Sequence, residues 1–182
     1  INYWRNIDKK IFFSFIILFL LGLFFSFSST SSLAGERLNK DYYFFFTKHL
    51  IFTFLALHIM FFISMIETTI LKKIIIPLFI IFFLLLAFVP FIGVEVKGAK
   101  RWLDFYYFRL QPIELLKPFF ILVTVNILTL KSLQNSQLKY FLSFLLLLSV
   151  IILLIDQPDL GQSILLIGSW IATVFISGVS LF

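Results

Sequence analysis

The 182-residue sequence contains no cysteine. This absence excludes disulfide bonds, thiolate metal ligands and catalytic thiols. The sequence also lacks a glycine-rich phosphate loop, and none of its His and carboxylate residues shows the spacing of a metal site. The residues therefore predict no metal ligands and no cofactor, and a divalent cation is left open.

Charged residues are scarce, at 13% of the chain, whereas hydrophobic residues make up 61% and include 27 Phe. So little polar surface could not cover a soluble globule, and the composition predicts an integral membrane protein. The formal charge of +6 suits neighbouring anionic lipids or phosphates, but ordinary basic loops would produce it too. We expect no nucleic-acid partner.

Six apolar runs have the length that a helix needs to cross a bilayer core of about 30 Å. They cover residues 11–28, 48–66, 74–95, 112–130, 138–156 and 162–182. The first run is followed by a Ser-rich polar loop instead of a cleavage site, so we interpret it as a span. The pattern predicts an all-α, polytopic helix bundle in which residues 1–182 form a single transmembrane domain. The apolar C-terminus and the Ile at position 1 suggest a piece of a longer protein.

Basic residues in short loops predict the orientation of the spans. One side of the predicted bundle carries Arg5, Lys9, Lys10, Lys72, Lys73, Lys131 and Lys139. This side is expected to be the cytoplasm, which places the N-terminus there and the loops 29–47, 93–111 and 157–161 outside. The expected location is the cytoplasmic, or inner, membrane.

The loop 93–111 departs from this rule, because it also carries several cations, among them Lys97, Lys100 and Arg101. One basic outer loop is tolerated, since orientation follows the sum over all loops. Alternatively, the cations form an anion site. In a single helical turn the three side chains would converge on one face, where a pyrophosphate would suit the Arg fork and the Lys point charges.

Aromatic residues of the same loop, Trp102, Tyr106 and Tyr107, have two interpretations. The more common role of such residues is to anchor a loop at the level of the lipid headgroups. The other is stacking against a sugar.

The segment "QPIELLKP" opens the fourth run. Pro112 suits the first turn of a helix, and Glu114 there interacts favourably with the helix dipole. Lys117 lies three residues further on, on the same face as Glu114. The pair either neutralises itself or faces a cavity, as ionisable residues within spans commonly do.

The segment "DQPDLGQS" joins the last two runs. Asp159 is expected to cap the last helix, and Asp156 to end the preceding one. Pro112, Asp159 and Gly161 are therefore predicted as hinge residues. The two carboxylates could also hold a catalytic or cation-binding group, and all three Pro-containing polar segments are predicted to lie on one side of the membrane.

The segments "GVEVKGAKRWL", "LQPIELLKP" and "QPDLGQS" resemble, in order and spacing, the signature segments of the SEDS family, which includes FtsW, RodA and SpoVE. The N-terminal context and "GVEVKGAKRW" are most similar to alphaproteobacterial FtsW. One departure is Ile113, where Ser or Ala is usual in the family. The family has about ten spans, so the resemblance implies that this chain is the N-terminal half.

The resemblance implies a peptidoglycan glycosyltransferase that polymerises lipid II at the outer face of the membrane during cell division. The implied partners are lipid II or undecaprenyl pyrophosphate, a class B penicillin-binding protein and other divisome proteins. The family's presumed catalytic base lies downstream, so no catalytic residue is expected here. The implied substrate-binding residues are Lys97, Lys100, Arg101, Trp102, Glu114 and Lys117. A lipid II flippase and a non-catalytic divisome scaffold are the alternative functions.

Overall fold

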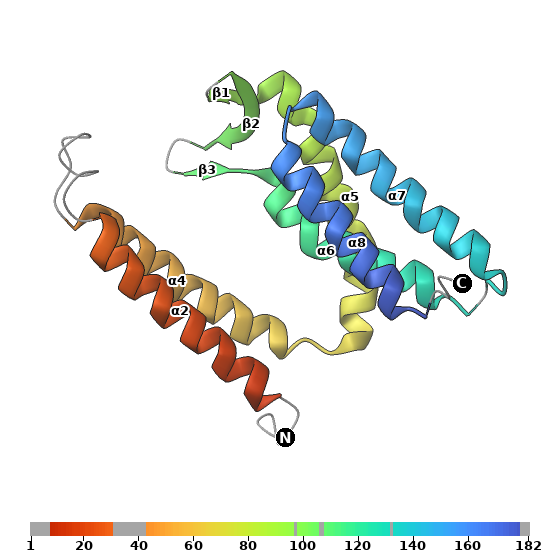
Figure 1. Cartoon of the computed structure of the whole chain (residues 1–182), viewed down its shortest axis with the longest axis horizontal. Helices are drawn as coiled ribbons and strands as arrows, with labels where there is room; N and C mark the ends of the chain where they lie inside the picture. The colour runs from red at the N-terminus through yellow and green to blue at the C-terminus, as the bar shows by residue number, and fades with distance from the viewer. Residues whose placement is uncertain (1–7, 31–42, 97, 106–107, 132, 179–182) are drawn as a thin grey trace. The chain divides into compact units, whose positions relative to one another are not determined.

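The computed structural model describes residues 8–30, 43–96, 98–105, 108–131 and 133–178. Within these ranges the chain forms six helices and three short strands (Figure 1). The helices are α2 (Lys9–Thr30), α4 (Phe44–Ser64), α5 (Thr68–Ile92), α6 (Pro112–Thr129), α7 (Ser136–Asp156) and α8 (Leu160–Ile176). Each of the six predicted spans therefore contains a helix. Five are long and apolar enough to cross a membrane, and α8 is a shorter apolar helix of 17 residues.

The chain divides into two compact units, Ile1–Glu67 and Thr68–Phe182. In the first unit α2 packs against α4. Ring contacts join the two helices, with Phe27 edge-on to Phe46 at 5.3 Å and stacked near Tyr43 at 6.2 Å between centroids. The single domain expected from the sequence stays a prediction.

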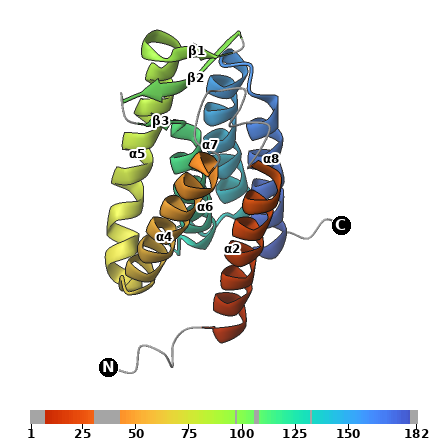
Figure 2. The same ribbon diagram turned by 90° about the vertical axis from the view of Figure 1, so that its left-hand side faces the viewer.

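In the second unit α6 packs against α5, α7 and α8 (Figure 2). Its buried residues Ile113, Leu116, Phe120 and Val123 recur at intervals of three and four, and so lie along one side of the helix. Lipid is as apolar as these side chains, so close packing and polar contacts, more than hydrophobicity, hold such helices together. One polar contact is the bond from Trp170 on α8 to buried Ser143 on α7, at 3.3 Å.

Three antiparallel strands, β1 (Val94–Val96), β2 (Ala99–Asp104) and β3 (Arg109–Leu110), follow α5 in the order β1-β2-β3. Val96 pairs with Ala99, and Gly98 just before Ala99 adopts a φ of +80° that glycine tolerates best. The helical turn suggested for "VKGAKRW" is therefore wrong. Alternate residues of a strand point to opposite faces, so adjacent cations do not converge.

Candidate functional site

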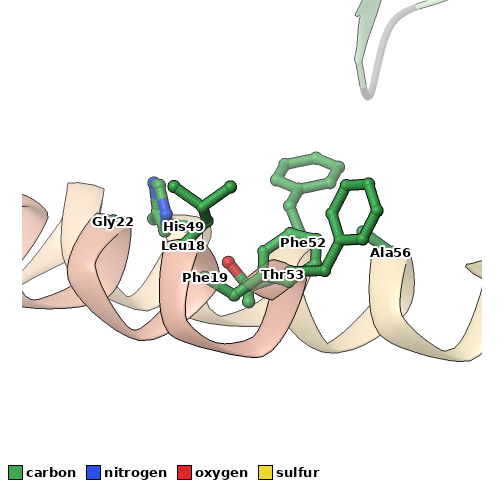
Figure 3. A pocket seen from close by; sticks show the side chains of 8 residues that line it. Leu18, Phe19, Gly22, His49, Phe52, Thr53 and Ala56 are labelled. Carbon is green, nitrogen blue, oxygen red and sulfur yellow. The ribbon is translucent and has the colours of Figure 1, made fainter. Parts of the chain in front are cut away.

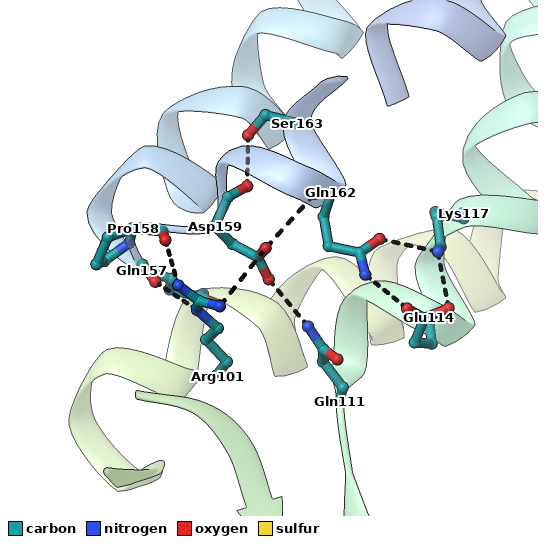
Figure 4. Close-up of polar contacts among 9 residues, drawn as sticks. All are labelled: Arg101, Gln111, Glu114, Lys117, Gln157, Pro158, Asp159, Gln162 and Ser163. Atoms are coloured by element: carbon teal, nitrogen blue, oxygen red, sulfur yellow. Dashed lines mark hydrogen bonds and ion pairs between the residues drawn. The ribbon is translucent and has the colours of Figure 1, made fainter. Parts of the chain in front are cut away.

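Polar side chains from three segments meet at one end of the second unit (Figure 4). The segments are β2, the start of α6 and the junction between α7 and α8. Hydrogen bonds join Arg101 to Gln157, Gln111 to Asp159, and Lys117 to Gln162. The three polar segments therefore meet at one end of the second unit, and their location on one side of the membrane stays a prediction.

Arg101 binds the C-terminal end of α7. Its Nε donates to the Gln157 carbonyl at 3.2 Å, and its Nη2 donates to the Pro158 carbonyl. Its Nη1 lies 3.9 Å from Asp159 Oδ1. The last carbonyls of a helix have no partner within the helix and carry partial negative charge, so a cation is favourable there. Arg101 therefore connects β2 to the junction between α7 and α8.

Lys100 points to a different helix end. Its Nζ lies 3.5 Å from the Pro90 carbonyl in the last turn of α5. Arg101 and Lys100 thus lie at the C-terminal ends of α7 and α5 respectively, and the expected convergence of these two cations is wrong. Lys97 lies outside the described residues, as do Tyr106 and Tyr107. The roles proposed for these three residues stay predictions.

Asp159 is the N-cap of α8, as the sequence predicts. Its Oδ1 accepts the backbone N–H of Gln162 at 3.4 Å, and its Oδ2 accepts a hydrogen bond from Gln111 Nε2 at 2.9 Å. The residue is only 6% exposed, so this carboxylate is buried among donors. The bond to Gln111 is a contact that sequence analysis missed. Asp156 ends α7 and is exposed.

Gln157 is a second contact residue that sequence analysis missed. It is 3% exposed, and its Nε2 donates to the Leu86 carbonyl at 3.0 Å. Proline has no N–H, so Pro90 leaves the carbonyl four residues earlier, that of Leu86, without its helical partner. The sequence signal for such a contact was the proline near the end of a predicted helix, because the carbonyl that a proline leaves unpaired requires a donor from elsewhere.

Glu114 and Lys117 form an ion pair, with Lys117 Nζ 2.7 Å from Glu114 Oε2. Gln162 bonds to both, accepting from Lys117 Nζ at 2.9 Å and donating to Glu114 Oε1 at 2.7 Å. The side chains of Lys117 and Glu114 are 23% and 50% exposed. The predicted pair is confirmed, and the described part of the chain leaves both side chains partly exposed.

The other residues named in the sequence prediction lie within helices or within the sheet. Pro112 is the first residue of α6 and is buried, and Ile113 is buried in the core at 1% exposure. Gly161 is the second residue of α8, where an added Cβ would lie 4.0 Å from Asp159 Oδ1. Trp102 is paired with Val94 in the sheet and is partly buried. Neither sugar stacking by Trp102 nor a hinge at Gly161 is tested by these positions.

The first unit contains an apolar hollow of about 500 Å³ between α2 and α4 (Figure 3). It is lined mainly by aliphatic and aromatic side chains, with His49 and the buried Thr53 as its polar members.

Among the described residues, no group of three or more His, Asp or Glu is placed to hold a metal ion.

The sequence model of the FtsW/RodA/SpoVE family, described as "Cell cycle protein", matches residues 8–182. The chain belongs to this family. Membership confirms the resemblance to SEDS proteins and the polytopic helical fold. Members of this family are membrane proteins, and the apolar helices agree with a multi-pass membrane protein.

Similar sequences include two named "Probable peptidoglycan glycosyltransferase FtsW". The one from Wigglesworthia glossinidia brevipalpis is 33% identical over 96% of this chain and 46% of the relative. The one from Caulobacter vibrioides is 29% identical over 97% of this chain and 45% of the relative. The chain thus spans about half the length of the curated relatives it matches.

Similar solved structures support the fold. One is described as "Structural coordination of polymerization and crosslinking by a peptidoglycan synthase complex" (TM-score 0.75, 26% identity, 91% of this chain and 47% of that chain). Another is the rod shape determining protein RodA of Thermus thermophilus (TM-score 0.69, 28% identity, 87% of this chain and 54% of that chain).

Proposed function

We propose that the full-length protein polymerises lipid II into glycan strands at the outer face of the cytoplasmic membrane during cell division. The names of the relatives and the likeness to a peptidoglycan synthase complex support this function. We also propose that the N-terminus lies in the cytoplasm, because basic residues gather in the loops predicted on that side.

The Glu114–Lys117 ion pair, which is partly exposed within this chain, is the observation that carries the proposal. Both charges lie in the first two turns of α6, at the end of a membrane-spanning helix where the other motif residues gather. Charged residues at such a position are costly unless they face a polar cavity or one another. A pair that remains partly exposed is suited to a polar headgroup such as that of lipid II.

The reaction would be a glycosyl transfer between two lipid-linked disaccharides. A hydroxyl of the acceptor forms a C–O bond to the anomeric carbon of the donor, whose bond to pyrophosphate breaks. The hydroxyl proton passes to a base supplied by a part of the protein downstream of this chain. Undecaprenyl pyrophosphate leaves with growing negative charge, so a cation beside it stabilises the transition state more than the ground state.

Lys117 is the cation that the geometry favours for this role. Glu114 and Gln162 occupy two of its three N–H groups, and no described residue accepts a hydrogen bond from the third. Lys100 is exposed and adds positive charge to the same end of the unit. Arg101 instead uses its guanidinium on the α7–α8 junction, so we propose that it supports the site without contacting the pyrophosphate. A phosphate contact by Lys97 stays a prediction.

The proposed partner is a class B penicillin-binding protein, which would crosslink the glycan strands. The similar solved complex is described as coordinating polymerisation and crosslinking, in agreement with such a pairing. Other divisome proteins are proposed on the family resemblance alone.

The test uses purified full-length protein with lipid II and no other glycosyltransferase, with and without the penicillin-binding partner. Glycan strands resolved by gel electrophoresis are the expected product, and Lys117→Met should lower their formation at least about tenfold. Movement of lipid II across vesicle membranes without any strands would favour the flippase instead. Full division activity in cells expressing Lys117→Met would favour the scaffold.

A further inference from the structure

The side-chain amide of Gln162 contacts both charges of the Glu114–Lys117 pair. Its Nε2 donates to Glu114 Oε1 at 2.7 Å, and its Oε1 accepts from Lys117 Nζ at 2.9 Å. Only one orientation of the amide satisfies both contacts, because a carboxylate accepts and an ammonium donates. The three side chains therefore form a closed ring of polar contacts.

The backbone of Gln162 is held in place from the other side. Its N–H is bound by Asp159 Oδ1 at 3.4 Å, and Ser163 donates to the Asp159 carbonyl through both its N–H and its hydroxyl. The Asp159 carboxylate is itself held by Gln111 at 2.9 Å. The Gln162 side chain thus extends from a fixed first turn of α8 to the pair on α6.

The ion pair alone would not fix the position of the Lys117 ammonium. A partly exposed ion pair at this helical spacing is weak, and a lysine stem has many rotamers. Glu114 is half exposed, which weakens the pair further. A second acceptor on another helix restricts the ammonium to one place.

We propose that Gln162 is a positioning residue that orients Lys117 and Glu114 for substrate. The consequence for catalysis rests on the proposed function, because it assumes that the pair faces lipid II. The claim that Gln162 fixes the positions of Lys117 and Glu114 does not rest on that function, because it concerns only contacts within this chain.

Two substitutions separate positioning from general loosening. In Gln162→Met both hydrogen bonds are lost, so Lys117 Nζ is held by Glu114 alone and can move. In Gln162→Glu a carboxylate oxygen can still accept from Lys117 Nζ, so the position of Nζ is kept. Only Gln162→Met should therefore make Nζ more accessible, whereas a loosened helix end would expose Lys117 in both variants.

The measurement is the acetylation rate of Lys117 by acetic anhydride in the detergent-purified full-length protein, followed by mass spectrometry with Lys139 as internal reference. We expect about a three- to tenfold faster reaction in Gln162→Met, and in Gln162→Glu a rate no higher than that of the unmodified protein. An unchanged rate in Gln162→Met, or a faster reaction in both variants, would overturn the proposal.

Gln137 provides a matched control. It too lies in the first turn of a helix, and its N–H is bound by the cap side chain of Asn135 at 2.9 Å. Gln137 is exposed and lies at the start of α7, whereas the polar site gathers around the end of that helix. Gln137→Met should leave the labelling of Lys117 unchanged.

Glycan formation is the second readout. Gln162→Met should lower turnover about tenfold with an unchanged unfolding temperature, and Gln137→Met should retain full activity. If Gln162→Met changes labelling as expected but polymerises normally, the catalytic part of the inference is wrong. If the unmodified protein makes no strands, the proposed function fails while the labelling result still decides the geometry.

Discussion

The amide of Gln157 donates to the carbonyl of Leu86 at 3.0 Å and replaces the helical hydrogen bond that Pro90 removes. A carbonyl without a donor is costly inside a membrane protein, because lipid offers no hydrogen bond in place of water. The bond therefore lets α5 contain a proline near its end and joins that helix to the junction of α7 and α8.

Gln157→Leu should destabilise the protein by about 1 to 3 kcal/mol, the usual cost of leaving a buried polar group unpaired. The measurement is the thermal or denaturant unfolding of the full-length protein in detergent. Gln137→Leu, a change of the same type at an exposed site, should have little effect.

Pro90→Ala tests why Gln157→Leu should lower the stability. The substitution restores an N–H that can bond to the Leu86 carbonyl within α5. In the Pro90→Ala background, Gln157→Leu should therefore cost clearly less than in the unmodified protein. Equal costs in both backgrounds would show that Gln157 does not act by satisfying this carbonyl.

Arg101→Ala should reduce stability together with any loss of activity, because Arg101 binds the end of α7. Its side chain is 35% exposed, so solvent screening limits the expected cost to about 1 kcal/mol. Arg101→Lys should retain only part of this stability, since lysine lacks the planar fork that reaches two carbonyls. Unfolding and glycan formation are measured on the same samples.

Arg109→Ala is the control, because Arg109 forms an exposed pair with Asp104 at 3.2 Å in the same sheet. It should leave the unfolding temperature nearly unchanged. If Arg101→Ala abolished polymerisation without changing stability, the result would support a direct contact between Arg101 and the pyrophosphate, as the sequence suggested.

Local signals in the sequence predicted much of the fold and part of the site. Apolar runs located the six helices of the described residues, because a membrane span needs a long apolar segment. The cap formed by Asp159 and the pairing of Glu114 with Lys117 were predictable, since each depends on residues within a few positions.

Contacts between distant segments were not predictable in the same way. The loop that carries Lys100 and Arg101 forms a hairpin, which depends on pairing between strands and on Gly98. The partners of Gln111, Gln157 and Gln162 come from helices 45 to 71 residues away. Glutamine has no charge or periodicity to mark it, and although Pro90 signals that the Leu86 carbonyl needs a donor, nothing local in the sequence indicates that Gln157 supplies it.

Asp159→Ala should loosen the first turn of α8, because the cap accepts the Gln162 N–H. The expected cost is about 1 kcal/mol, and Asp159→Asn should cost less because its side-chain oxygen can still cap the helix. Hydrogen exchange followed by mass spectrometry should show faster exchange at Gln162 in the Ala variant. Unchanged exchange there would mean that Asp159 does not stabilise this turn.

Gly93→Ala should be the most damaging of the glycine substitutions in the second unit. Gly93 lies between α5 and β1, where an added Cβ would come within 2.4 Å of the Val89 carbonyl and 3.3 Å of the Trp102 carbonyl. Both neighbours are backbone atoms, so the hairpin must move away from the end of α5, at a cost of about 1 to 3 kcal/mol. Gly168→Ala is the matched control, because a Cβ there meets no atom within 4 Å and alanine favours the helix by about 1 kcal/mol. Equal unfolding temperatures for the two variants would show that the close approach of α5 to β2 is not required for stability.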